Sequence, residues 1–202
     1  MTVYVETNFV LEIVFSQEQS PACLKILALA ERRQISLVLP AYCLLEPFET
    51  INRRHGARTE LVSRLERELF QLERSAQFAE QVGPAGQLTS QLMTSSTEQE
   101  RNAFDEFRPK LVAASEIVPL TGEIIHAGLG FERLHNLSVP DAIVYASIRS
   151  HLETVRPEKS CFINKNTRDF SDQDINRVLT QANCTMIPNF DHGHKYILSN
   201  LS

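Results

Sequence analysis

The amino-terminal stretch Met1-Thr-Val-Tyr-Val-Glu-Thr-Asn-Phe9 contains the first strand of the chain and an acid directly after it. Val3, Tyr4 and Val5 form a short apolar run, which is typical of a strand buried on both faces of a parallel sheet. Glu6 follows where this strand should end. In open α/β sheets the carboxyl ends of the strands form the ligand-binding edge. Glu6 is therefore either a ligand-binding acid or a solvated turn residue.

Further strand-like segments alternate with helical segments along the rest of the chain. Each is short, rich in β-branched or aromatic residues and followed by a polar break, and they cover residues 35–39, 116–120, 161–163 and 185–187. Strands that alternate with helices form parallel sheets, because each crossover returns the chain to the same end of the sheet. We predict an α/β fold with three α/β/α layers and a central parallel sheet of about five strands.

A long helical stretch, residues 56–115, separates the second and third predicted strands. Leu61, Leu65, Leu69 and Leu72 recur at helical spacing, and Gly83-Pro84-Ala85-Gly86 is predicted to end this first helix. A second helix is predicted to follow. The apolar pattern is too short for a coiled-coil seam, so we expect a helical hairpin inserted into a single domain that covers residues 1–202.

Composition limits the function classes. The 202-residue chain has a net charge of −5 and a pI of about 5.7, so it is not a strongly basic nucleic-acid binder, and any phosphate contacts would need a local basic patch. Apolar runs stay below the roughly 20 residues that span a bilayer, and no secretory signal begins the chain. We expect a cytoplasmic protein whose four cysteines are buried free thiols.

Four acids lie where the predicted fold brings strand ends together. Glu6 follows the first strand, Glu46 follows the second, Asp169 follows the fourth, and Asp141 opens a helix. Carboxylates that meet in one cleft stay ionised together only when a cation holds them. Hard oxygen ligands favour Mg²⁺ or Mn²⁺, and such ions can activate a water for phosphodiester hydrolysis.

Each acid also has a structural interpretation that needs no metal. Ser138-Val-Pro-Asp141 has the form of a capping box, and an acid in the first turn of a helix is favoured by the helix dipole. Glu46 can be explained in the same way. Asp169 can be a loop residue that closes a local turn. A helix cap can also be a metal ligand, so the two interpretations of Asp141 are compatible.

The four acids fall within segments that together resemble a known family. The segments are, in order, Val3-Tyr-Val-Glu-Thr-Asn8, Leu39-Pro-Ala-Tyr-Cys-Leu-Leu-Glu46, Leu137-Ser-Val-Pro-Asp141-Ala-Ile and Phe162-Ile-Asn-Lys-Asn-Thr-Arg-Asp169-Phe. Together they look like the four motifs of PIN-domain ribonucleases, and more distantly those of VapC-type toxins. The resemblance covers residues 2–54 and 116–188.

The resemblance implies a metal-dependent endoribonuclease. Its metal-binding acids would be Glu6, Glu46, Asp141 and Asp169, with Mg²⁺ or Mn²⁺ as cofactor, and Asn8 and Asn166 would be supporting polar residues. The first acid of such enzymes is usually Asp, so Glu6 departs from the family pattern. The implied partners are an RNA substrate, an antitoxin-like protein and a second copy of the chain. Two alternatives stay open: a catalytically inactive binding module, and a DNA-directed nuclease that uses the same acids.

Basic residues near the proposed site are candidate contacts for RNA phosphates. Arg53 and Arg54 belong to the densest basic cluster, and Lys165 and Arg168 flank the fourth motif. Cationic side chains commonly supply the sequence-independent part of nucleic-acid binding. The arginine cluster is also explained, without any substrate, as a solvated helix end.

Overall fold

The structure is a computed structural model of the chain, and it describes residues 1–165, 170 and 172–201. The contacts divide it into two compact units. We call Met1–Pro47 together with Phe107–Ser202 the sheet unit, and Phe48–Glu106 the hairpin unit. The sequence placed the helical insertion at 56–115, and the hairpin unit overlaps that range but starts and ends earlier.

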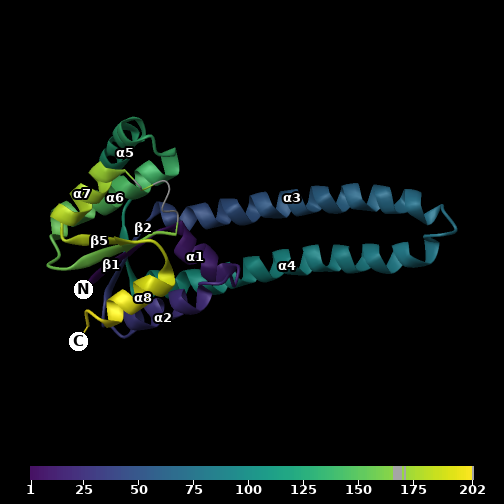
Figure 1. The fold of residues 1–202 in the computed structure, drawn as a ribbon, viewed down its shortest axis with the longest axis horizontal. Coiled ribbons are helices and arrows are strands. Elements are labelled where there is room, and N and C mark those ends of the chain that lie inside the picture. The colour runs from purple at the N-terminus through teal and green to yellow at the C-terminus, as the bar shows by residue number, and fades with distance from the viewer. Residues whose placement is uncertain (166–169, 171, 202) are drawn as a thin grey trace. The chain divides into compact units, whose positions relative to one another are not determined.

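The sheet unit is built on one parallel sheet (Figure 1). Within the described residues its strands are β1 (Thr2–Val5), β2 (Ser36–Pro40), β3 (Ser115–Val118), β4 (Ser160–Ile163) and β5 (Cys184–Ile187), in the spatial order β3-β2-β1-β4-β5. This confirms the predicted fold class. The strand order changes direction beside β1, since β2 and β3 lie on one side of it and β4 and β5 on the other. The switch point of the sheet is therefore the gap between β1 and β4.

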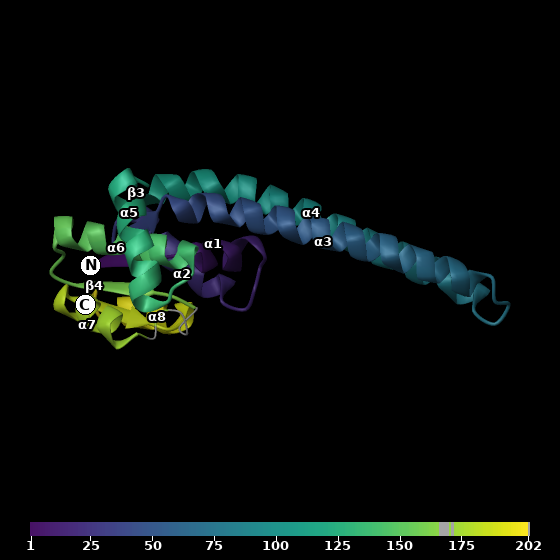
Figure 2. The ribbon, with the colours of Figure 1, turned by 90° about the horizontal axis from the view of Figure 1, so that it is seen from above.

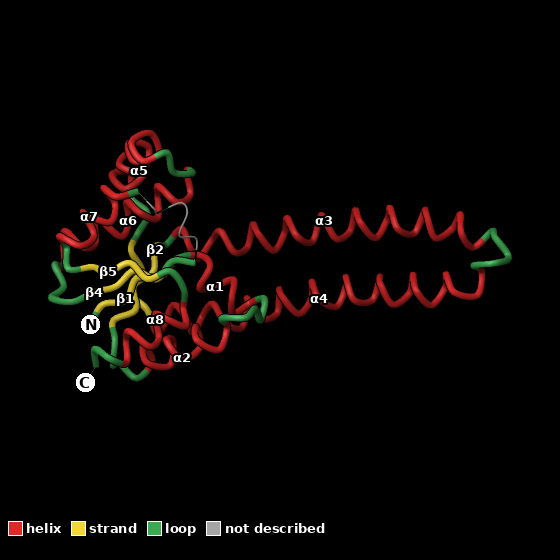
Figure 3. Tube along the Cα trace, in the orientation of Figure 1, coloured by secondary structure: helices red, strands yellow, loops and turns green. Residues whose placement is uncertain are grey.

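Helices cover both faces of this sheet (Figure 3). Tyr4 pairs in register with Phe162, and on this face the Tyr4 hydroxyl lies 2.8 Å from His151 Nδ1 of α6 (Val139–Val155). The next residue of β4, Ile163, faces the opposite way and contacts α8 (Phe190–Leu198). Helices α5 (Gly122–His135) and α7 (Gln173–Gln181) lie on the α6 side, and α1 (Thr7–Val14) and α2 (Ser20–Glu31) lie on the α8 side.

The core of the sheet unit is centred on β1. Val3, Tyr4 and Val5 are fully buried, as the apolar run predicts. Fully burying an aliphatic or aromatic side chain contributes about 1.5–3 kcal/mol, so this strand is a major source of stability. All four cysteines are buried free thiols, which confirms the prediction. None of the described helices is both long and apolar enough to cross a membrane.

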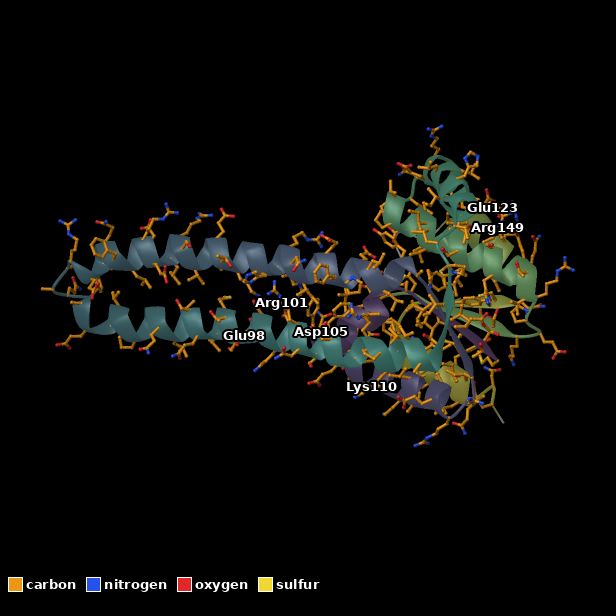
Figure 4. The ribbon with its side chains drawn as sticks, turned by 180° about the vertical axis from the view of Figure 1, so that it is seen from behind. Glu98, Arg101, Asp105, Lys110, Glu123 and Arg149 are labelled. Carbon is orange, nitrogen blue, oxygen red and sulfur yellow. The ribbon has the colours of Figure 1, made fainter. Side chains whose placement is uncertain are left out.

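The hairpin unit consists of residues 48–73 of α3 (Tyr42–Glu73) and residues 79–106 of α4 (Ala79–Ala114), which run antiparallel (Figure 2). Arg58 of α3 forms an ion pair with Glu100 of α4, in which Nη2 lies 2.6 Å from Oε1. Arg101 projects toward α3 (Figure 4) and donates to Asn52 at 3.3 Å. These contacts fix the register of the two helices.

One local prediction for this unit is wrong. Gly83-Pro84-Ala85-Gly86 does not end a helix but lies inside α4, and the chain turns instead at residues 74–78. The reason is packing across the hairpin. A Cβ atom added to Gly86 would lie 3.0 Å from Leu69 Cδ1, so the glycine lets the two helices approach closely. This tertiary contact outweighs the low helix propensity of glycine.

Candidate metal centre

Glu6 occupies the carboxyl end of β1, at the switch point of the sheet. Glu6 is the N-cap residue of α1, and its Oε2 accepts a hydrogen bond from the backbone amide of Asn8 at 2.8 Å. The side chain is buried, and within the described residues Oε1 accepts no well-formed hydrogen bond. This buried carboxyl therefore has an oxygen that remains available to a ligand.

Burial controls the charge of this carboxyl. It raises the pKa of Glu6 from 4.5 to about 7, and the nearby charge of Glu46 adds to the rise. The amides of Asn8 and Lys165 favour the ionised form and oppose the rise, but burial outweighs them. Near neutral pH a bound cation would decide whether Glu6 is ionised.

Glu46 is held near Glu6 by Thr7, the residue that follows Glu6 in the chain. Thr7 begins α1, is buried, and donates a hydrogen bond from its hydroxyl to Glu46 Oε2. Glu46 lies in the second turn of α3, which follows β2. The structure thus brings Glu6, Thr7 and Glu46 into one cluster at the carboxyl edge of the sheet. One oxygen of Glu46 is fixed in place by this contact.

Asp141 lies in the first turn of α6 as part of a helix cap. The Ser138 hydroxyl accepts from the Asp141 backbone amide at 3.3 Å, as the predicted cap requires, and it also donates to Asp141 Oδ2. Asp141 also acts on the site electrostatically. The pKa of Tyr42 is raised chiefly by burial, and the charges of Glu46 and Asp141 both add to it. Tyr42 is therefore close to both acids.

Comparison with protein families identifies this arrangement. A family model described as PIN domain matches residues 3–170, which include all four predicted acids. The chain belongs to the PIN-domain family. PIN domains are generally nucleases that act on nucleic acids, and they generally use divalent metal ions. Comparisons with curated proteins and with solved structures gave no match.

The remaining predicted residues of the PIN site lie in different places. Asp169, Asn166 and Arg168 fall outside the described residues. Asn8 supports Glu6 with its backbone amide and also with its side chain, both of which lower the pKa of that acid. Arg53 and Arg54 belong to α3 within the hairpin unit.

The described donors suit a divalent ion in chemistry but do not by themselves form a full ligand set. Within residues 1–165, 170 and 172–201, no three acid, histidine or cysteine side chains group closely enough to hold a metal. Glu6 Oε1 is an unused buried oxygen, and Glu46 stands beside it. Carboxylate oxygens are the ligands that Mg²⁺ and Mn²⁺ prefer. The residues present therefore fit such an ion as a partial site.

Lys165, which is predicted to contact RNA, forms an ion pair with a buried acid. Its ammonium group donates to Glu12 Oε1, and Glu12 Oε2 accepts from the Gln19 amide at 2.9 Å. Glu12 is almost fully buried in α1, so the pair connects this helix to the segment after β4. Glu12 was not predicted, although a single acid within the apolar pattern of residues 9–15 is an available signal.

Thr7 is the other residue that sequence reasoning missed. Its only signal was a hydroxyl next to a candidate acid at the end of a strand. A hydroxyl at the first helical position has many uses, so this signal does not specify a contact with Glu46. The contact depends on how α3 packs beside α1, which is a tertiary property.

Proposed function

We propose that this PIN-domain protein is an endoribonuclease that hydrolyses RNA phosphodiester bonds with Mg²⁺ or Mn²⁺. Glu6, Glu46, Asp141 and Asp169 would hold the metal. One observation carries the proposal: a buried Glu6 carboxyl with an unused oxygen stands beside Glu46 at the switch point of a parallel sheet. Ligands bind at such points in open α/β folds. We also place the protein in the cytoplasm, where RNA substrates are present.

The residues around the metal would each have a defined role. Glu6 would release its proton when metal binds, because metal ligands must be ionised. Thr7 holds one oxygen of Glu46 and so orients the other, and Asn8 does the same for Glu6. When bound, a divalent ion supplies an activated water and stabilises the charge that develops on the phosphodiester.

The test is cleavage by wild type and by Asp141→Asn. We expect wild type to cleave RNA with Mn²⁺ and to stop when the metal is chelated. The variant should lose at least about 100-fold in rate, because a neutral amide is a poor ligand yet keeps the Ser138 cap. Asp174→Asn is a matched control, since Asp174 is an exposed acid at the start of another helix, α7.

Substrate class is tested in the same assay with single-stranded RNA, single-stranded DNA and branched DNA. Cleavage of RNA alone supports the proposal, whereas preferred cleavage of either DNA supports a DNA-directed nuclease. Equal cleavage of RNA by wild type and folded Asp141→Asn would show that the proposed acids are not catalytic. Circular dichroism of each variant establishes that it is folded.

A further inference from the structure

The hairpin unit exposes an apolar stripe on α3 that is separate from its contacts with α4. Leu61 is 51% exposed and Leu72 is 45% exposed. Leu61, Leu65 and Leu72 are spaced by four and seven, so they lie on one side of the helix, and the exposed Glu68 lies among them. The contacts with α4 are made by Arg58 and Leu69 on the neighbouring side. This stripe is therefore available to another molecule.

The facing half of α4 carries a second stripe that lacks charge. Residues 81–97 contain no Asp, Glu, Lys, Arg or His, although they form most of the amino-terminal half of α4. Ala85 and Leu92 repeat at an interval of seven, Phe78 stands at the same interval just before α4, and Leu92 is 58% exposed. Depletion of charge is typical of the centre of a protein–protein interface.

Both stripes lie on the same side of the hairpin. A groove of about 280 Å³ between the two helices is lined by residues that include His55, Thr59 and Glu98. Successive residues are rotated by about 100° around a helix axis. By this rotation the groove residues lie to one side of the line of contact between the two helices, and Leu61, Leu72 and Leu92 lie to the other side. The stripes therefore combine into one surface opposite the groove, which we call the outer face.

We propose that the outer face binds the outer face of a second copy of this chain, with a two-fold axis near residue 66 of α3. Antiparallel pairing about this axis places Leu61 of one copy beside Leu72 of the other. It also places Arg64 beside Glu68, which are exposed residues of opposite charge on either side of the axis. Neither has an ion-pair partner among the described residues. A self-complementary pattern of this kind is what an isologous interface requires.

The contact area is adequate for a weak but specific dimer. The turn at residues 74–78 limits the overlap to about 20 residues, which is about 30 Å of helix. Two helices side by side are about 20 Å wide, so each copy contributes about 600 Å², or about 1,200 Å² in total. Specific interfaces begin near this size, and we expect a dimer whose population depends on concentration. The proposal does not depend on nuclease activity.

The experiment measures the dimer dissociation constant of the full chain by sedimentation equilibrium. Arg64→Glu and Glu68→Arg should each weaken dimerisation at least about tenfold, because two attractive contacts become two repulsive ones. An equimolar mixture of the two variants should recover the dimer, since an all-acidic face then meets an all-basic one. Arg67→Glu on the back of α3 is the charge control and should leave the constant unchanged.

A second pair of variants tests the apolar part. The double variant Leu61→Ser and Leu72→Ser should shift the chain to monomer, whereas Phe70→Ser, an exposed residue outside the outer face, should not. A monomeric wild type at all accessible concentrations would overturn the proposal, as would variants that do not recover when mixed. If Arg64→Glu instead weakens RNA binding by a monomeric wild type, the outer face is a nucleic-acid surface and the proposal is wrong.

Discussion

Burial at the end of β1 disfavours the charged form of Glu6, whereas a metal ligand must carry that charge. The conflict is resolved if a cation is bound, and without one the buried charge is a source of instability. Glu6 should therefore link the pH, the stability of the fold and metal binding. This linkage can be measured without any substrate.

Glu6→Gln should stabilise the metal-free protein at alkaline pH. The pKa of Glu6 is raised in the folded state from 4.5 to about 7, so the folded chain binds more protons than the unfolded chain between these values. Stability of the wild type should fall as pH rises through this window, and the amide removes that loss. At about pH 8 we expect a gain of about 2–3 kcal/mol in the free energy of unfolding, and little change near pH 4.

Urea unfolding with a chelator present measures this effect, and Glu123→Gln on α5 serves as the exposed control (Figure 4). Added Mn²⁺ should make the wild type more stable than Glu6→Gln, because the ion binds and stabilises the wild type alone. A stability difference that does not vary with pH would contradict the account of Glu6.

Sequence reasoning reached individual acids but not their partners. Glu6 and Glu46 were predictable because each follows a recognisable strand, and strand ends meet at one edge. The contact of Thr7 with Glu46 and the pairing of Lys165 with Glu12 join residues far apart in the chain. Spacing along the sequence contains no information on such contacts. The contact of Lys165 with RNA stays a prediction, and the buried Glu12 is a partner that the sequence did not indicate.

At the scale of elements, the sheet unit depends on close approach between layers. Helix α8 lies against β4 at Gly193, where an added Cβ would be 2.4 Å from Ile163 Cδ1 and 3.1 Å from Cγ2. Ile163 ends the strand that forms one side of the switch point. Packing on this side therefore supports the same edge that carries the candidate metal centre.

Gly193→Ala should destabilise the protein by about 1–3 kcal/mol, because the methyl group overpacks against the fully buried Ile163 side chain. Gly130→Ala in α5 is the matched control, since no atom of the described residues outside its own helix lies within 4 Å of the added Cβ. That change should be neutral or stabilising by up to about 1 kcal/mol, from helix propensity alone. Chemical denaturation compares the two, and equal effects would mean that the α8–β4 contact is not tight.

Element identity was largely predictable, whereas element ends inside the insertion were not. The alternating strands and helices of the sheet unit follow from apolar patterns of period two and 3.6. The glycine and proline cluster at residues 83–86 has the composition of a turn but lies in a helix. The close approach of Leu69 from the facing helix to Gly86 is a tertiary contact that no local sequence pattern indicates.

At the scale of the whole molecule, the candidate site is assembled from segments that are distant in sequence. Glu6 follows β1, Glu46 lies in α3, and Asp141 opens α6. A parallel sheet makes this possible, since all its crossovers return to one edge. The family match over residues 3–170 covers all of these segments. The sequence predicts that these acids lie at the carboxyl edge of the sheet, but the distances between them depend on how the helices pack.

The most direct test of the central claim is anomalous diffraction from a crystal of the wild-type protein soaked with Mn²⁺. We predict one strong peak at the carboxyl edge of the sheet, coordinated by Glu6 Oε1 and by Glu46, and its loss in Glu6→Gln. A peak bound elsewhere, or one at this edge that does not involve Glu6, would contradict the account.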